Sequence, residues 1–230
     1  MHIATIVTDT SEKRFRTLVD VATRHGTRIN AITEVGTFGH GKGWGQRVRA
    51  MRRYLASLPP SDIAMFVDGY DVLINAPECE ILSRFNALAA GRPVVVFNAE
   101  SNCWPFPDLA AEYPPCDSPY KYLNGGGCIG RVDVFSKLLD THMRFDDADF
   151  DRIDDQGEFT KIFLGTPGAI VLDSGNTIFN CMFGRESDLE FHRGRGWFNK
   201  VTKTYPVVFH ANGSVPQKFL FDKIAPTMLA

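Results

Sequence analysis

Residues 63–74 read IAMFVDGYDVLI, and this segment holds the most informative pattern in the chain. The run from Ile63 to Val67 is apolar or small throughout, which is typical of a strand buried on both faces of a sheet. Gly69 permits a turn directly after Asp68, and Asp71 follows three residues beyond Asp68. Because ligands of open α/β sheets bind beyond the carboxyl ends of the strands, we expect both aspartates to face a ligand.

Two carboxylates at such a position repel each other unless a positive group lies between them or one of them is protonated. A hard divalent cation with oxygen ligands removes that conflict, and it would also bridge a diphosphate. The alternative is that one of the two aspartates caps the following turn while the other is solvated. The segment by itself leaves both interpretations open.

The rest of the chain alternates between strand-like and helix-like patterns. Apolar runs predict strands at 2–8, 28–33, 61–68, 92–100, 169–173 and 206–210. Amphipathic spacing predicts helices after a Ser11 cap and at 46–58, 77–90, 132–142 and 156–164. We therefore predict one α/β domain over residues 1–230, with a mainly parallel sheet covered by helices on both faces. Only about the last ten residues look like a tail.

Composition narrows the class of protein. The 230 residues are 44% hydrophobic and carry a formal net charge of −2, which predicts no broad attraction to nucleic acid or to anionic membranes. No apolar stretch approaches the roughly 20 residues that a membrane span needs. We see no signal peptide at the N-terminus, and five scattered cysteines indicate free thiols. The expected location is cytoplasmic.

Six aspartates fall between residues 146 and 155. The first four, Asp146, Asp147, Asp149 and Asp151, are interpreted as a solvated acidic loop. Asp154 and Asp155 stand at the start of a predicted amphipathic helix. They would either cap that helix or be presented into a cleft at the carboxyl edge of the sheet.

Three further segments have a possible role at a ligand site. The glycines after Asn124 either admit a ligand close to the backbone or form a plain turn. The loop GHGKGWG is not a phosphate-binding Walker A motif, because no Ser or Thr follows Lys42. His210 ends the last predicted strand, and a lone histidine there is more often a hydrogen-bonding residue than a metal ligand.

Six segments in a fixed order resemble the N-terminal glycosyltransferase domain of the procollagen lysyl hydroxylases. They are GWGQRVRAMRRYL (43–55), FVDGYDV (66–72), FNAESNCWPFP (97–107), KYLNGGGCIG (121–130), IDDQGEFTKIFL (153–164) and VVFHANGS (207–214). The resemblance covers the chain from Ile3 to about Ala225. It implies a GT-A-like, Rossmann-type nucleotide-sugar-binding fold and sugar transfer without a hydroxylase domain.

The resemblance also assigns roles. It implies that Asp68, Asp71 and His210 bind a metal, usually Mn²⁺, and that Asp154 and Asp155 lie near the transferred sugar. The implied donor is a UDP-sugar, UDP-glucose or UDP-galactose, and the acceptor is an unidentified hydroxyl. The positions that the resemblance implies at the donor are Thr8, Arg47, Tyr70, Trp104, Asn124, Gly126, Asn212, Gly213 and Lys218.

Three positions depart from the family pattern. Arg47 stands where the family has Lys, Gly125 replaces Ser, and Ala211 replaces the Gly between His210 and Asn212. Two extra residues precede Lys218, which puts its register in doubt. None of these departures removes an expected metal ligand or changes a charge.

Overall fold

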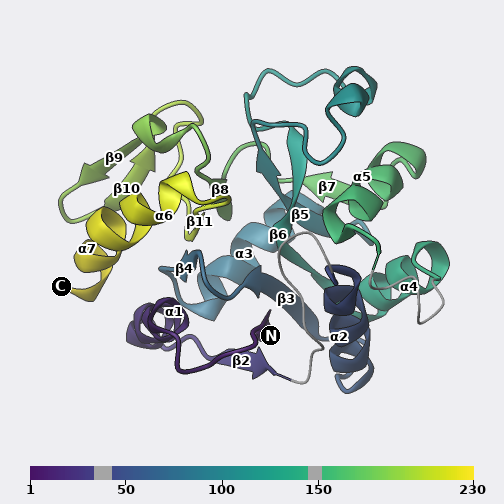
Figure 1. Cartoon of the computed structure of the whole chain (residues 1–230), viewed down its shortest axis with the longest axis horizontal. Coiled ribbons are helices and arrows are strands. Elements are labelled where there is room, and N and C mark those ends of the chain that lie inside the picture. The colour runs from purple at the N-terminus through teal and green to yellow at the C-terminus, as the bar shows by residue number, and fades with distance from the viewer. Residues whose placement is uncertain (34–42, 145–151) are drawn as a thin grey trace.

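The computed structural model describes residues 1–33, 43–144 and 152–230 (Figure 1). Its central sheet has six strands in the order β2-β1-β3-β6-β5-β7. Five of them run in one direction, and β6 runs antiparallel to both of its neighbours, β3 and β5. The strands are β1 (His2–Ile6), β2 (Ile29–Ile32), β3 (Ile63–Asp68), β5 (Val95–Glu100), β6 (Tyr122–Arg131) and β7 (Ile170–Leu172). The predicted mainly parallel sheet is confirmed.

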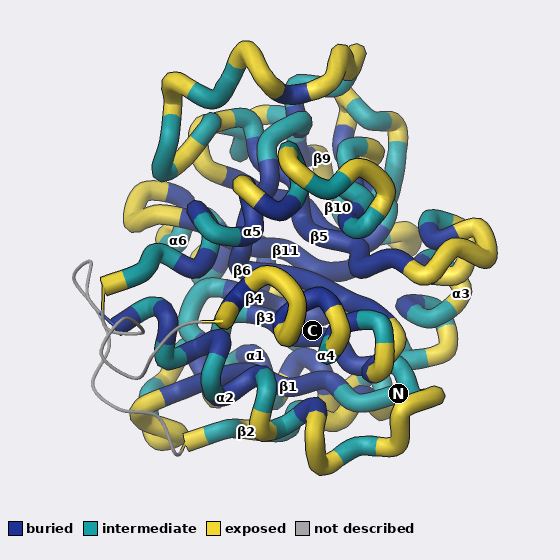
Figure 2. Tube along the Cα trace, turned by 90° about the vertical axis from the view of Figure 1, so that its right-hand side faces the viewer, coloured by how far each residue is buried: buried dark blue, intermediate teal, exposed yellow. Residues whose placement is uncertain are grey.

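Helices cover both faces of this sheet (Figures 1 and 2). Alternate residues of the central strands enter separate cores, so that Met65 packs with one set of helices and Phe66 with the other. The first core contains apolar residues of α1 (Lys13–Arg24) and α3 (Glu78–Ala89). The second core contains those of α2 (Gly45–Ala56), α4 (Val132–His142) and α5 (Asp155–Gly165). Burial on both faces explains why these strands read as continuous apolar runs.

A second, three-stranded sheet lies on the first core. It has the order β4-β11-β8, with β4 (Val72–Ile74), β8 (Phe179–Cys181) and β11 (Val208–His210). Leu73, Phe179 and Phe209 are buried in the same core as Met65. The chain also forms a hairpin of β9 (Leu189–His192) and β10 (Gly196–Asn199). Of these strands only β11 was predicted, because the others are short and carry no long apolar run.

The C-terminal segment is helical. It consists of α6 (Val215–Phe219), a π-helical turn (Leu220–Ile224) and α7 (Ala225–Leu229). Leu220 and Ile224 are fully buried in the first core. The residues that the sequence suggested as a tail are therefore packed against the domain.

Of the two interpretations of the glycines after Asn124, the plain turn is wrong. Residues 122–131 form β6, the longest strand of the sheet, and every residue from Leu123 to Gly130 is buried. Glycine fits here because its neighbours leave no room for a side chain: a Cβ at Gly127 would lie 2.9 Å from the Phe179 ring. A run of glycines thus indicates close packing in this strand and no change of direction.

Two smaller expectations about where helices begin are corrected. Glu12, and not Ser11, caps α1, since its carboxylate accepts hydrogen bonds from the backbone N–H groups of Arg14 and Phe15. Pro77, the first residue of the helix predicted over 77–90, is the N-cap of α3. The stretch between β5 and β6 contains a 3₁₀ helix at Pro107–Glu112, which was not predicted.

All five cysteines are free thiols in the structure, as the sequence suggested. Among the described residues, no helix is both long and apolar enough to cross a membrane. Asp146, Asp147, Asp149 and Asp151, together with Lys42 and most of the glycine-rich loop, lie outside the described residues.

Candidate functional site

A cavity of about 960 Å³ opens at the carboxyl ends of β3, β5 and β11. The amino-terminal half of β6 reaches the same edge, because this strand runs in the opposite direction. The residues expected from the sequence that line the cavity are Arg47, Asp68, Asp71, Trp104, Asn124, Gly126, Asp154, Asp155, His210, Asn212 and Gly213. Thr8, Tyr70 and Lys218 are not among its lining residues.

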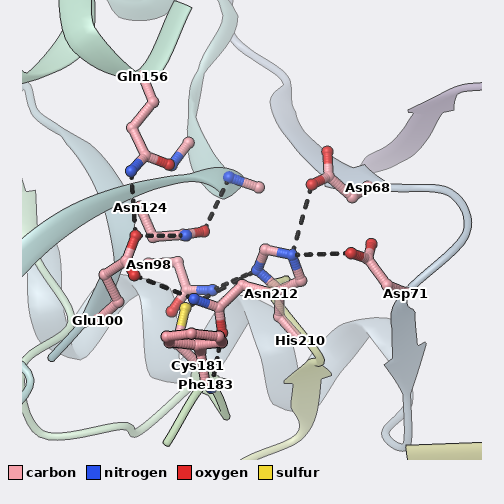
Figure 3. Close-up of polar contacts among 12 residues, drawn as sticks. Asp68, Asp71, Asn98, Glu100, Asn124, Gln156, Cys181, Phe183, His210 and Asn212 are labelled. Carbon is pink, nitrogen blue, oxygen red and sulfur yellow. Dashed lines mark hydrogen bonds and ion pairs between the residues drawn. The ribbon is translucent and has the colours of Figure 1, made fainter. Parts of the chain in front are cut away.

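Asp68, Asp71 and His210 converge on the cavity wall, with one ligand atom of each within 4.8 Å of the others. Nε2 of His210 lies 3.4 Å from Oδ2 of Asp68 and 3.6 Å from Oδ2 of Asp71 (Figure 3). Asp68 is the last residue of β3 and His210 the last of β11. Two strand ends from different sheets therefore bring the three residues together.

The turn at Gly69 places Asp71 in this group. A Cβ at Gly69 would lie 2.1 Å from Cγ1 of Val7 and 2.8 Å from Oγ1 of Thr5, so only glycine fits between β3 and the end of β1. The backbone C=O of Asp71 then accepts a hydrogen bond from the N–H of Ala211 at 2.8 Å. That bond ties the loop of Asp71 to the residue after His210.

The charges of the group are strongly coupled. Burial lowers the pKa of His210, but the facing carboxylates of Asp71 and Asp68 outweigh it and raise the pKa well above 6.5. Burial raises the pKa of Asp68, whereas Arg47 and His210 more than offset it, so that this pKa is lowered overall. Without another cation, the imidazole thus carries the positive charge that two carboxylates require.

The side chains present suit a divalent cation. Two carboxylate oxygens and one imidazole nitrogen are common ligands of such ions, and Nε2 is the ring nitrogen that faces the carboxylates. Nδ1 faces the amide of Asn98 at 3.4 Å, while Oδ1 of Asn98 is buried and has no hydrogen-bond partner among the described residues. Turning that amide by 180° would let Oδ1 accept from Nδ1–H, which is the tautomer that a metal on Nε2 requires.

Arg47 joins the metal-binding group to the acidic start of α5. Its guanidinium lies 2.6 Å from Oδ1 of Asp68 and 2.9 Å from Oδ2 of Asp155, and the side chain is buried. Burial lowers the pKa of Arg47, but the carboxylates of Asp155 and Asp68 more than compensate and raise it. Arg47 therefore remains charged and fixes two carboxylates relative to each other.

Asp154 and Asp155 occupy different environments. Asp154 is the N-cap of α5, and its Oδ1 accepts a hydrogen bond from the N–H of Gly157 at 2.8 Å. Asp155 is 4% exposed, and burial raises its pKa to about 6 although Arg47 opposes the shift. Both residues line the cavity, as the cleft interpretation predicted, and Asp154 also caps the helix, as the cap interpretation predicted.

Glu100 is a cavity residue that the sequence did not single out. It ends β5 and is 4% exposed. Its carboxylate accepts hydrogen bonds from the side-chain amides of Asn124, Gln156 and Asn212 (Figure 3). The available signal was a carboxylate at the end of the strand predicted over 92–100, although Asn98 interrupts the apolar run that precedes it.

Tyr70 and Thr8 meet at the exposed end of β1. The Tyr70 hydroxyl accepts hydrogen bonds from the backbone N–H groups of Thr8 at 2.9 Å and Asp9 at 2.7 Å. The guanidinium of Arg14 lies 5.8 Å from the centre of the Tyr70 ring. The two residues expected at a base are thus neighbours, on a surface next to the turn that carries Asp71.

Two more expected residues are exposed. Trp104 is 64% exposed, lines the cavity and precedes Pro105 through a cis peptide bond. Lys218 is exposed on α6, where Gln217 lines the cavity instead.

Gly213 has a φ of +84°, and a Cβ there would lie 2.9 Å from the Phe183 ring, so glycine is required at the turn after Asn212.

Comparisons with known proteins agree with this architecture. A family model described as the PLOD GT domain matches residues 1–225. Protein R699 of Acanthamoeba polyphaga mimivirus is 35% identical over 181 residues, covering 78% of this chain and 37% of that protein. The human multifunctional procollagen lysine hydroxylase and glycosyltransferase LH3 is 33% identical over 181 residues, covering 74% of this chain and 23% of LH3. The match thus spans well under half the length of either relative.

Two solved structures share the fold at low sequence identity. A glycosyltransferase involved in glycosylation of the major capsid of PBCV-1 superposes with a TM-score of 0.54 at 13% identity, over 93% of this chain and 96% of that one. The galactosyltransferase LgtC, in complex with donor and acceptor sugar analogs, gives 0.54 at 12% identity, over 100% and 97%. Both are similar to this chain in the GT-A arrangement of their elements.

Proposed function

Because this chain belongs to the PLOD GT domain family of glycosyltransferases, we propose that it transfers glucose or galactose from a UDP-sugar to an acceptor hydroxyl, with Mn²⁺ or another divalent cation. The observation that carries the proposal is the convergence of Asp68, Asp71 and His210 on the wall of a cavity large enough for a nucleotide sugar. These three residues would hold the cation. When bound, it would neutralise the charge that develops on the leaving diphosphate.

The acidic residues of α5 would act on the sugar. The bond from the sugar to phosphate breaks with positive charge developing at the anomeric carbon. Asp155, with a pKa of about 6, is a carboxylate at neutral pH and would stabilise that charge. Arg47 would hold Asp155 in place through their 2.9 Å ion pair. Asp154 uses Oδ1 to cap α5, and we propose that Oδ2 orients the acceptor hydroxyl.

The remaining predicted residues would bind the donor. We assign the base to Tyr70 and Thr8, whose hydrogen bonds keep the Tyr70 ring at the end of β1. The diphosphate is assigned to the turn of Asn212 and Gly213, with Lys218 beyond it on α6. The sugar is assigned to the cavity wall formed by Asn124, Gly126 and Trp104.

The direct test is UDP release from a panel of UDP-sugars in the presence of Mn²⁺. A transferase releases UDP faster when a suitable hydroxyl acceptor is added, and the labelled sugar appears on that acceptor. Acceptor-independent release would identify a UDP-sugar hydrolase instead. Binding of UDP-sugar without release under any condition would identify a nucleotide-sugar-binding protein and contradict the proposal.

A further inference from the structure

Glu100 is a buried carboxylate in the cavity wall that the mechanism above does not use. It is 4% exposed, and no Lys, Arg or His among the described residues forms an ion pair with it. Burial raises the pKa of Glu100, although its amide partners and the charge of His210 oppose this shift. A buried charge without a directly paired cation is costly, so its retention in the wall needs a reason beyond packing.

Three amide nitrogens satisfy this carboxylate. Oε1 accepts from Nδ2 of Asn124 at 2.8 Å and from Nε2 of Gln156 at 3.0 Å, and Oε2 accepts from Nδ2 of Asn212 at 3.0 Å. The three partners come from β6, from α5 and from the turn after β11. One side chain thus connects three separate segments of the cavity (Figure 3).

The oxygen atoms of the same amides hold the backbone of the site. Asn124 Oδ1 accepts from the N–H of Gly126 at 2.9 Å, and Gln156 Oε1 accepts from the N–H of Gly125 at 2.8 Å. Asn212 Oδ1 accepts from the N–H groups of Met182 and Phe183 at 2.9 and 3.1 Å. Each amide is therefore fixed at both ends, with its nitrogen on Glu100 and its oxygen on a loop or strand.

We propose that Glu100 is a positioning residue that sets the orientation of these three amides, and with it the hydrogen-bonding character of the donor pocket. A carboxylate offers acceptors only, so each amide must turn its nitrogen toward Glu100. The nitrogens of Asn124 and Asn212 each keep a second N–H, whereas Nε2 of Gln156 also donates to the backbone C=O of Trp104 at 2.8 Å. All three residues line the cavity. The pocket is thereby provided with donors for the oxygens of a sugar diphosphate, which deepens and rests on the proposed function.

The test exchanges donor and acceptor between two partners. In Glu100→Gln, the NH₂ group of the introduced glutamine must face an amide nitrogen that Glu100 accepted from. To avoid this contact between two donors, one amide turns over, and its NH₂ group then faces a backbone N–H. In Asn212→Asp, two carboxylates face each other at about the 3.0 Å of the present bond. The double variant restores the pairing, since the introduced glutamine can donate where Glu100 accepted and the introduced carboxylate can still accept from Met182 and Phe183.

We expect kcat/KM for UDP release to fall at least about tenfold in each single variant, because a buried hydrogen bond to a charged group is lost. The double variant should recover at least about tenfold relative to the lower single variant. Mn²⁺ affinity should stay within about threefold in Glu100→Gln, since the three metal-binding residues are unchanged. A merely structural role would lower the unfolding temperature without this rescue.

Asp173→Asn provides a matched control. Asp173 is a fully buried carboxylate that accepts hydrogen bonds from the N–H groups of Thr177, Ile178 and Phe179, and it does not line the cavity. This variant should lose stability but keep kcat/KM. Unchanged kcat/KM in Glu100→Gln, or a double variant no better than the lower single variant, would overturn the proposal.

The proposed function fails separately, if the wild-type chain releases no UDP from any UDP-sugar. In that case the free energies of unfolding of the wild type, the two single variants and the double variant still measure the coupling between Glu100 and Asn212. Zero coupling would overturn the assignment of Glu100 as the residue that orients Asn212. A favourable coupling would uphold that assignment in a chain that is not a transferase.

Discussion

Gly126 lies so close to His210 that a Cβ at position 126 would be 2.2 Å from Cε1 of the imidazole. The same Cβ would lie 2.6 Å from Oδ2 of Asp68. The backbone of β6 thus forms one wall of the candidate metal site. It leaves no room for a side chain at position 126.

Gly126→Ala should therefore weaken Mn²⁺-dependent UDP binding by at least about tenfold, because the added methyl group displaces His210 or Asp68. The measurement is UDP affinity by calorimetry with and without Mn²⁺. Gly165→Ala is the control, since a Cβ at Gly165 meets nothing within 4 Å. Equal affinities in the two variants would contradict the tight fit at Gly126.

Asp71→Ala should abolish Mn²⁺-dependent UDP binding while the unfolding temperature changes little. The variant removes one of three metal-binding groups, and Asp71 is a half-buried loop residue outside the core. Asp133→Ala, at an exposed position on α4, controls for loss of charge. If Asp71→Ala bound UDP and Mn²⁺ as the wild type does, the three residues would not form the metal site.

The pH dependence of metal binding follows from His210. The facing carboxylates hold its pKa well above 6.5, so the metal-free imidazole is protonated at neutral pH. A metal ion must displace that proton, and lower pH favours the protonated form. Mn²⁺ affinity should therefore rise with pH, by about tenfold per unit, through neutral pH and above it.

An isolated imidazole would lose metal affinity only below about pH 6.5. Calorimetry in buffers of different ionisation enthalpy should count about one proton released per Mn²⁺ bound at pH 7. A constant affinity between about pH 7 and pH 8, with no proton released, would show that the carboxylates do not raise this pKa.

Asp155→Asn tests the assignment of the acidic pair. If Asp155 stabilises charge on the sugar, kcat should fall about a hundredfold to a thousandfold, while UDP affinity changes little. In the wild type, kcat should decrease as the pH falls through about 6, because the buried carboxylate takes up a proton there. Asp140→Asn, on the exposed side of α4, should behave as wild type. Mild and equal effects in both variants would assign Asp155 to structure alone.

The cysteines give a prediction about accessibility. Cys79 and Cys116 are exposed and should react with a thiol reagent in the native protein, whereas Cys128 and Cys181 are buried. Burial also raises the pKa of Cys181 to about 12, which lowers its reactivity further. Denaturation without reductant should release all five thiols. A count of three would indicate a disulfide and argue against the cytoplasmic location, which stays a prediction.

Much of the candidate site was predictable because the ends of buried strands can be recognised in the sequence. Apolar runs that end in Asp68 and His210 are visible in the chain, and the carboxyl ends of such strands meet at one edge of an α/β domain. Asp71 followed from its spacing to Asp68. Family resemblance then supplied the partnership of His210 with the two aspartates, which no spacing along the chain could indicate.

Other parts of the site depend on contacts that single segments do not encode. Runs of glycine usually indicate turns, so the sequence did not predict the buried strand β6. In that strand Phe179 and His210 leave no room for side chains at the glycine positions. Glu100 looked like an ordinary strand end, because its three amide partners lie 24, 56 and 112 residues away. The direction of β6 and the role of Glu100 both arise only when distant segments pack.

The reversed strand β6 also has a consequence for synthesis on the ribosome. The strands β1 and β3 pair with each other early, but the free edge of β3 finds its partner only when residues 122–131 have emerged. Until then a row of unpaired backbone groups on β3 is open to pairing with another nascent chain. The order of translation thus leaves the strand that ends in Asp68 with an open edge in the unfinished protein.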